Sequence, residues 1–234
     1  MLLEVKEIHT YYGKSHILHG ISLGADRGET VALLGRNGFG KSTILKSIMG
    51  LAPPESGSVL FKEKEILGLK PFIICRMGMG FVPQERRIFP NLTVRQNLIL
   101  GIQPNQKAAD PWTIEKVYGH FPQLAKTERQ KGRCLSGGEQ QMLTIGRTLM
   151  GNPELLLVDE PTEGLSPQMV DLVLDMIRVM QEKGCAIILV EHALDIALKI
   201  AQRVYVMAKG LVVWGGTKDE FYADEGVRKK YLEV

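Results

Sequence analysis

The sequence predicts an α/β fold built from a parallel-sheet core, an antiparallel β-subdomain near the N-terminus and a helical subdomain. Three observations support this. Short runs of alternating polar and apolar residues fill the opening third, strand patterns alternate with helical patterns from residue 154 onward, and the stretch between about 93 and 151 has helical patterns without a convincing strand. We expect a single domain over 1–234, with about 1–92 and 152–234 as core plus antiparallel β-subdomain and about 93–151 as helical subdomain.

The individual elements follow from the same patterns. In the opening third, alternation predicts antiparallel strands at 2–9, 16–23, 29–34 and 58–62, and helical spacing begins with residues 41–49. The later units are expected as strands at 154–158, 186–190 and 203–207 and as helices at 166–181 and 192–200. Strands that alternate with helices in this way are typical of a parallel sheet covered on both faces.

Size and composition exclude several classes of protein. A chain of 234 residues with 24% charged side chains can bury a sizeable core. Its longest apolar stretches, such as 185–190, are far shorter than the ~20 residues that cross a bilayer, and the first residues lack the pattern of a secretory signal. Three cysteines without a C-x-x-C pair favour a reducing cytoplasm. A net charge of +3 is too small to indicate nucleic acid as a partner.

A phosphate-binding loop is predicted after the strand that ends near residue 34. Residues 35–42 read Gly-Arg-Asn-Gly-Phe-Gly-Lys-Ser and fit the pattern G-x-x-x-x-G-K-[ST] between a strand and a helix, the setting that this motif requires. The glycines allow backbone N–H groups to converge on a phosphate at the positive end of the helix. Lys41 would neutralise the β- and γ-oxygens, and the Ser42 hydroxyl would bind Mg²⁺. A glycine-rich turn capped by Ser42 is the alternative, which the lysine and its setting disfavour.

Two acidic residues end a later strand. Asp159 and Glu160 follow the apolar run 155–158, at the carboxyl edge where ligands of parallel sheets collect. We expect Asp159 to hold the magnesium shell and Glu160 to polarise an attacking water. Acidic residues that merely end a strand before Pro161 would look the same in isolation, but a phosphate loop elsewhere in the chain disfavours that interpretation.

A second phosphate-binding element is predicted where a helix begins after residue 135. Ser136 and Glu139 form an S-x-x-E capping box, which explains the helix start. Gly137 and Gly138 need another reason, because each costs up to about 1 kcal/mol against alanine in a helix interior. Exposed N–H groups, a hydroxyl and a positive helix end together suit a γ-phosphate. Since one phosphate loop already binds one nucleotide, we expect this helix to serve the nucleotide of a partner.

In this order, the motifs resemble those of ABC transporter nucleotide-binding subunits, and the resemblance runs through nearly the whole chain. It implies the P-loop NTPase (RecA-like) fold and hydrolysis of ATP with Mg²⁺. The implied ATP contacts are Tyr12 on the adenine and the Walker A residues Gly35, Arg36, Asn37, Gly38, Phe39, Gly40, Lys41, Ser42 and Thr43. The remaining matches are Gln84 of the Q-loop, the signature residues Ser136, Gly137, Gly138 and Glu139 for the partner's ATP, the Walker B pair Asp159 and Glu160, and the switch histidine His192.

The resemblance also implies what these residues do. Glu160, His192, Gln84 and Lys41 would act in hydrolysis, with His192 holding the γ-phosphate and positioning the water. The metal ligands would be Ser42, Gln84 and Asp159. A lone glutamine or histidine is more often structural, so the roles of Gln84 and His192 depend on the ordered occurrence of all the motifs.

Residues 80–94, 135–142 and 230–234 look like the smaller ATPase subunit of branched-chain amino-acid importers. The ATPases of urea or short-amide importers share much of this sequence, including residues 12–18, and membership of that group is the alternative. The resemblance implies a cytoplasmic subunit held at the inner face of the cell membrane by transmembrane permease subunits. Its other partners would be a homologous ATPase subunit, in a heterodimer or else a homodimer, and indirectly a solute-binding protein.

Two other classes are less consistent with the sequence. ABC ATPases of DNA repair or translation usually carry a long coiled coil or two motif sets, whereas here 52 positions separate Gln84 from Ser136 and each motif occurs once. A P-loop kinase would have no use for the signature helix. The chain departs from the family pattern at three positions: Phe39 replaces a small residue, Glu139 replaces a common glutamine, and Ser166 stands where an aspartate is expected.

Overall fold

A six-stranded sheet forms the centre of the computed structural model, which describes residues 1–103 and 110–232. Its order is β10-β9-β3-β8-β7-β6, and all neighbours are parallel except β10, which runs antiparallel to β9. The strands are β3 (Thr30–Gly35), β6 (Met79–Val82), β7 (Leu155–Asp159), β8 (Ala186–Val190), β9 (Arg203–Ala208) and β10 (Leu211–Thr217). The predicted parallel core is confirmed, although the sequence patterns did not indicate β6 and β10.

The expectation that 29–34 belongs with the antiparallel strands is wrong. This segment is β3, which pairs in parallel with β8 and β9. Val31 and Leu33 are buried in one hydrophobic cluster, and Ala32 and Leu34 in another on the opposite face of the sheet. Because both faces are covered, all four positions 31–34 of β3 take an apolar residue, as is usual in a parallel sheet.

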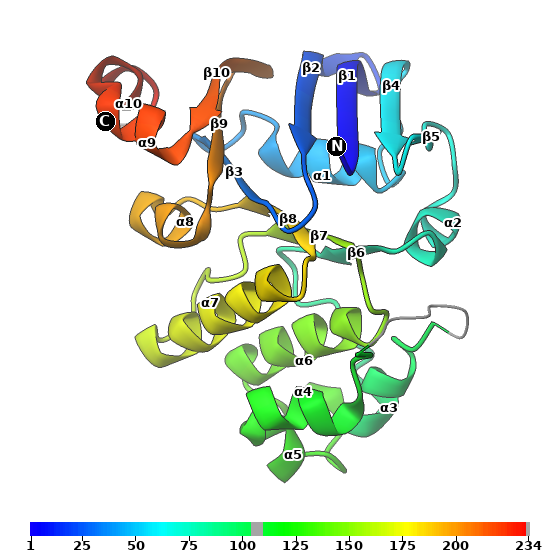
Figure 1. The fold of residues 1–234 in the computed structure, drawn as a ribbon. Coiled ribbons are helices and arrows are strands. Elements are labelled where there is room, and N and C mark those ends of the chain that lie inside the picture. The colour runs from blue at the N-terminus through cyan, green and yellow to red at the C-terminus, as the bar shows by residue number, and fades with distance from the viewer. Residues whose placement is uncertain (104–109, 233–234) are drawn as a thin grey trace.

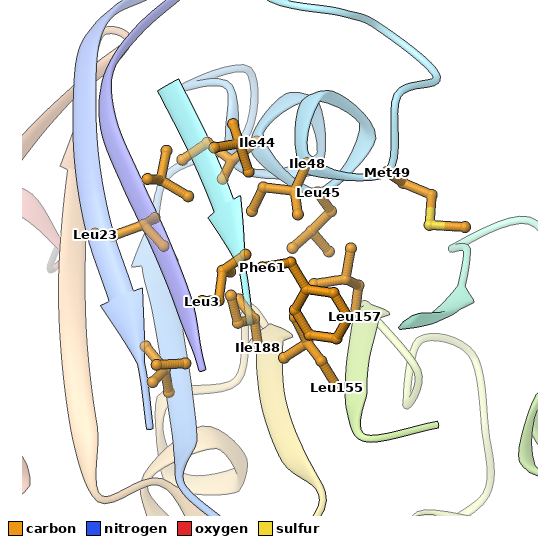
Figure 2. Close-up of a cluster of buried hydrophobic side chains, with 14 of the residues drawn as sticks. Leu3, Leu23, Ile44, Leu45, Ile48, Met49, Phe61, Leu155, Leu157 and Ile188 are labelled. Atoms are coloured by element: carbon orange, nitrogen blue, oxygen red, sulfur yellow. The ribbon is translucent and has the colours of Figure 1, made fainter. Parts of the chain in front are cut away.

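A second sheet of four strands contains the N-terminus, in the order β2-β1-β4-β5 (Figure 1). It consists of β1 (Leu3–Tyr12), β2 (Ser15–Ala25), β4 (Ser56–Phe61) and β5 (Lys64–Glu65), and its pairings are antiparallel as predicted. Helix α1 (Lys41–Ile48) packs between the two sheets. Figure 2 shows Ile44 and Leu45 of α1 in one cluster with Phe61 of β4 and Leu157 of β7. This packing fixes the start of α1, where Lys41 lies, against the central sheet.

The helices between β6 and β7 gather beyond the central sheet, on the side away from the N-terminal strands (Figure 1). They are α3 (Val94–Ile99), α4 (Ile114–His120), α5 (Pro122–Lys126), the 3₁₀ turn Gly132–Cys134 and α6 (Gly137–Leu149). Their core is continuous with α7 (Pro167–Glu182) and with Leu156 and Leu189 on one face of the sheet. The subdomain boundaries near 92 and 152 therefore stay a prediction.

The other helices cover the remaining surfaces of the sheets. They are α2 (Pro71–Arg76), α8 (Leu194–Ile200), α9 (Lys218–Ala223) and α10 (Glu225–Tyr231). Phe221 of α9 and Ala197 of α8 pack with Val204 and Val206 of β9. None of the helices in the described ranges 1–103 and 110–232 is long and apolar enough to span a bilayer.

Candidate functional site

The predicted phosphate loop connects the carboxyl end of β3 to the start of α1. Its glycines adopt backbone angles that other residues rarely take: φ is 148° at Gly35, 79° at Gly38 and 96° at Gly40. A Cβ atom on Gly35 would lie 2.5 Å from the backbone oxygen of Met207, and one on Gly40 would lie 2.9 Å from Leu18 Cδ2. The loop therefore needs glycine for its curvature and for its close approach to β9 and β2.

Lys41 is the first residue of α1, and its side chain is buried. Its ammonium donates to the backbone oxygens of Gly35 at 2.7 Å and Arg36 at 3.1 Å, so the loop wraps around it. Burial lowers the pKa of Lys41, and the nearby carboxylates of Glu160 and Asp159 partly offset this effect. The ammonium thus lies at the centre of the loop, where a phosphate would meet it.

Ser42 and Asp159 meet beside this loop. The Ser42 hydroxyl donates to Asp159 Oδ1 at 2.9 Å, and Asp159 is 1% exposed at the end of β7. Burial raises the pKa of Asp159, and the Ser42 hydrogen bond partly opposes this rise. A hydroxyl and a carboxylate are oxygen ligands of the kind that Mg²⁺ prefers.

The charge balance of the interior fits a divalent cation. Among the residues that the structure describes, the buried charged side chains are three carboxylates and one ammonium, namely Asp159, Glu160, Glu191 and Lys41. When all four are ionised, these buried side chains carry an excess of two negative charges. Buried charges are costly without compensation, so this donor set suits Mg²⁺.

Three of the predicted catalytic side chains contact one another. Glu160 Oε1 lies 2.6 Å from His192 Nε2, and Glu160 Oε2 accepts from Gln84 Nε2 at 3.1 Å. Gln84 also donates to Glu163 Oε2 at 2.9 Å. Glu160 has a φ of 46°, and its N–H donates to the Val190 oxygen at 2.9 Å. The turn after β7 thus directs this carboxylate toward the loop after β8, which carries the histidine.

A cavity of about 420 Å³ joins these groups. Tyr12, which is 49% exposed and ends β1, borders it together with the phosphate loop, Gln84, Glu160 and His192. Of the predicted ATP contacts, Tyr12, Asn37, Gly38, Gly40, Lys41, Ser42 and Thr43 line this cavity. The lining does not include Gly35, Arg36 or Phe39, and Phe39 is half-buried with its backbone oxygen accepting the Gly210 N–H.

Helix α6, which begins with two glycines, does not line this cavity. Ser136 Oγ accepts the Glu139 N–H at 3.4 Å, and the Glu139 carboxylate accepts the Ser136 N–H at 2.8 Å, so the predicted capping box is present. Ser136, Gly138 and Glu139 line a separate hollow of about 500 Å³ with the start of α7. A Cβ atom on Gly137 would lie 2.1 Å from Arg86 Nη1. The structure does not bring α6 to the phosphate loop of its own chain.

Some residues near the site were not assigned a role from the sequence. Arg86 Nη2 donates to the backbone oxygen of Glu163 at 3.1 Å and so links the segment after Gln84 to the segment after Glu160. Thr162 and Glu191 are buried and hydrogen-bonded to each other. The only signal in the sequence was their position next to motif residues, because polarity alone does not predict burial.

Comparisons with known proteins identify the family of the chain. The family model described as "ABC transporter" matches residues 18–163. The chain is 39% identical over 231 residues to the "High-affinity branched-chain amino acid transport ATP-binding protein BraG" of Pseudomonas aeruginosa, with 99% of each chain covered. It is 34% identical over 234 residues to the "Probable branched-chain amino acid transport ATP-binding protein LivF" of Archaeoglobus fulgidus, covering 100% of this chain and 99% of that protein. Relatives named for other cargoes also match.

A solved structure titled "Structure of ATP binding subunit of ABC transporter" superimposes with a TM-score of 0.87 at 27% identity, and the match covers 100% of this chain and 97% of that one. The family model covers more than half of the chain, and the two relatives match it from end to end. The chain therefore belongs to the ABC transporter family, as one of its ATP-hydrolysing cassettes.

Proposed function

We propose that this chain is the ATP-binding and ATP-hydrolysing subunit of an ABC importer for branched-chain amino acids. The observation that carries the chemical part is the convergence of Lys41, the Ser42–Asp159 pair and the Glu160–His192–Gln84 cluster on one cavity. The end-to-end similarity to two proteins named for branched-chain amino-acid transport supports the cargo.

In this proposal, the cavity holds ATP with its triphosphate on the phosphate loop. Tyr12 stacks on the adenine, and the backbone N–H groups of 35–43 surround the β-phosphate at the start of α1. Lys41 exchanges the backbone oxygens of Gly35 and Arg36 for phosphate oxygens. Ser42, Asp159 and Gln84 would hold Mg²⁺, which would supply positive charge to the phosphates.

Hydrolysis then depends on the side chains around Glu160. The Glu160 carboxylate orients a water molecule toward the γ-phosphate and accepts its proton. His192, 2.6 Å from the same carboxylate, fixes its orientation and lies on the cavity wall, where it can donate to the γ-phosphate. Lys41 stabilises the charge that develops on the transferring phosphoryl group.

The signature residues are proposed to act on the ATP of a second ATPase subunit. Ser136, Gly138 and Glu139 line a hollow that is separate from the cavity at the phosphate loop. A head-to-tail pair would place this hollow over the partner's triphosphate, where the N–H groups at the start of α6 suit an anion. By the resemblance to importers of this type, we propose a homologous, non-identical partner, and a pair of identical chains is the alternative.

A third hollow suits the permease. It measures about 420 Å³ and lies between β6, the end of α3 and α6. Phe89 and Leu100 on its border are 49% and 52% exposed, and Arg147 lies 5.1 Å from the centre of the Phe89 ring. An apolar rim with one cation fits a short helix from a membrane protein. Docking there would hold the chain at the inner face of the membrane, below a solute-binding protein on the other side.

Three experiments test this function. Purified chain should bind ATP and hydrolyse it with Mg²⁺, and Lys41→Ala should abolish both. Tagged chain, purified from detergent-solubilised membranes of its own host, should bring down a multi-helix permease, and deletion of the gene should reduce uptake of labelled leucine. Loss of urea uptake instead would favour the urea or short-amide importer, and recovery with ribosomes or DNA would contradict transport.

A further inference from the structure

A buried carboxylate lies directly behind the proposed catalytic side chains. Glu191 follows β8, its side chain is 4% exposed, and the lining of the nucleotide cavity does not include it. A carboxylate at such a position is costly unless hydrogen bonds compensate its charge. The partners that supply these bonds identify what Glu191 holds in place.

One oxygen of Glu191 binds the backbone of the switch loop. Oε1 accepts the His192 N–H at 2.8 Å and the Ala193 N–H at 3.3 Å. Ala193 is the N-cap residue of α8 and has no side-chain cap of its own. Glu191 therefore directs the chain as it leaves β8, and the helix predicted from residue 192 begins at Leu194 instead.

The other oxygen reaches the segment that follows β7. Oε2 accepts the Thr162 hydroxyl at 2.6 Å, and Thr162 is itself buried, two residues after Glu160. One carboxylate thus joins the two strand exits that carry Glu160 and His192. The side chains of those residues meet at 2.6 Å on the cavity side.

The Glu160 turn needs such support. Glu160 has a φ of 46°, a left-handed conformation that costs free energy for any residue with a Cβ atom. Strained conformations persist only where surrounding contacts fix them. The bond from Thr162 to Glu191 supplies a contact of this kind, together with the Glu160 N–H on the Val190 oxygen.

We propose that Glu191 is a positioning residue for ATP hydrolysis: it fixes the backbone of His192 relative to Thr162 and so sets the contact between the His192 imidazole and the Glu160 carboxylate. This inference rests on the proposed function. Because Glu191 does not line the cavity, its removal should slow turnover while leaving nucleotide binding nearly intact.

Glu191→Gln is the first variant to measure. The amide oxygen can still accept the His192 N–H, but the amide nitrogen can only donate to Thr162, so the short bond from the Thr162 hydroxyl to a carboxylate becomes a weaker, neutral bond in the opposite direction. The single-turnover rate of ATP hydrolysis should fall on the order of tenfold, since small displacements of catalytic groups have effects of this size or larger. The affinity for ATP should stay within about twofold, because no ligand contact is lost. Thr162→Val removes this bond completely and should cause a loss at least as large.

Glu154→Gln is the matched control. Glu154 precedes β7 at the opposite edge of the same sheet, where it is paired with Lys62 and Arg27. This substitution also removes one partly buried charge and its hydrogen bonds. It should change the free energy of unfolding without changing the rate of hydrolysis.

A double variant distinguishes positioning from general stability. If Glu191 acts through His192, then Glu191→Gln should slow hydrolysis in the wild-type chain but cause no further loss in a His192→Ala chain. An equal loss in both backgrounds would overturn the inference. So would unchanged rates in Glu191→Gln and Thr162→Val, or a loss confined to ATP affinity. If Glu191→Gln fails to fold, the Thr162→Val series decides alone.

The same measurements separate this inference from the proposed function. A wild-type chain that binds no ATP would contradict the function. A wild-type chain that binds and hydrolyses ATP, beside a Glu191→Gln chain with the same rate, would contradict only the role of Glu191.

Discussion

Replacing Glu160 by glutamine tests the proposed chemistry most directly, because the change removes a base and almost nothing else. The carboxylate has two partners: His192 Nε2 at 2.6 Å and Gln84 Nε2 at 3.1 Å. In Glu160→Gln, the amide oxygen can accept from Gln84 while the amide nitrogen donates to a neutral His192. Since both contacts survive, the free energy of unfolding should change by no more than about 1 kcal/mol.

The effect on the rate should be much larger. A positioned general base contributes roughly 10²- to 10⁴-fold to a reaction. At about 1.4 kcal/mol for each factor of ten, this corresponds to an increase of about 3–5 kcal/mol in the activation free energy. Affinity for ATP should rise slightly, because one buried negative charge next to the triphosphate is gone.

Phosphate release under single-turnover conditions, with ATP binding measured in parallel, checks both expectations. Glu163→Gln is the control, because Glu163 accepts a hydrogen bond from the same Gln84 amide at 2.9 Å but is exposed. Its rate should stay within about fivefold of wild type, since it makes no contact with His192. A wild-type rate in Glu160→Gln, or an equal loss in both variants, would refute the assignment of the base.

Two further predictions concern local structure. Gly38→Ala should cost about 1–2 kcal/mol of stability through its left-handed backbone alone, because a Cβ atom there meets nothing within 4 Å. Gly40→Ala should cost about 1 kcal/mol more in the same urea titration, because its Cβ atom also presses on Leu18, and equal costs would contradict this. In iodoacetamide labelling at pH 8 followed by mass spectrometry, exposed Cys134 should react first. Cys185 should react only after unfolding, because burial raises its pKa to about 12, and early labelling of Cys185 would contradict its burial.

The sequence predicted the fold where local pattern and tertiary environment agree. The strands β7 and β8 lie within one residue of their predicted ranges, because an uninterrupted apolar run of this length suits a strand buried on both faces. The helix start at Ser136 was visible because a capping box is a local interaction. The predicted antiparallel pairing of β3 was wrong, because the residues of a short apolar strand do not indicate which sheet the strand joins. The four residues of β6 were too few to form a pattern.

The site could be predicted as a set of residues, and its contacts could not. Motif order placed Gln84, Glu160 and His192 in the same proposal although 76 residues separate the first two. It gave no indication that the glutamine amide would also bind Glu163, or that Glu191 would turn inward beneath the histidine. Both depend on side-chain directions at strand exits, which change with a single backbone angle such as the positive φ of Glu160. Such angles are determined by tertiary contacts and not by the local sequence.

The two excess negative charges of the buried side chains also predict how tightly the chain should bind ATP when no metal ion is present. Lys41 and Ser42 already have protein partners, so their contacts with ATP and Mg²⁺ would exchange hydrogen bonds, and the strength of binding there depends on charge. Removing Mg²⁺ with EDTA should therefore weaken ATP binding to the wild-type chain at least about tenfold, or about 1.4 kcal/mol. Asp159→Asn removes one of the charges, so it should bind metal-free ATP more tightly than wild type while losing the response to Mg²⁺.

The pH dependence of stability provides an independent check of the same charge. Burial raises the pKa of Asp159, so the folded chain binds this proton more tightly than the unfolded chain. The contribution of Asp159 to stability is therefore greatest at low pH and is lost as the pH rises from the unfolded to the folded pKa. Asp159→Asn should thus raise the free energy of unfolding at pH 7 relative to wild type, with a smaller difference at pH 4 in urea titrations. If the variant were less stable than wild type at pH 7, the Ser42 hydrogen bond would outweigh the cost of burying the charge, and the interior would not need a cation to balance it.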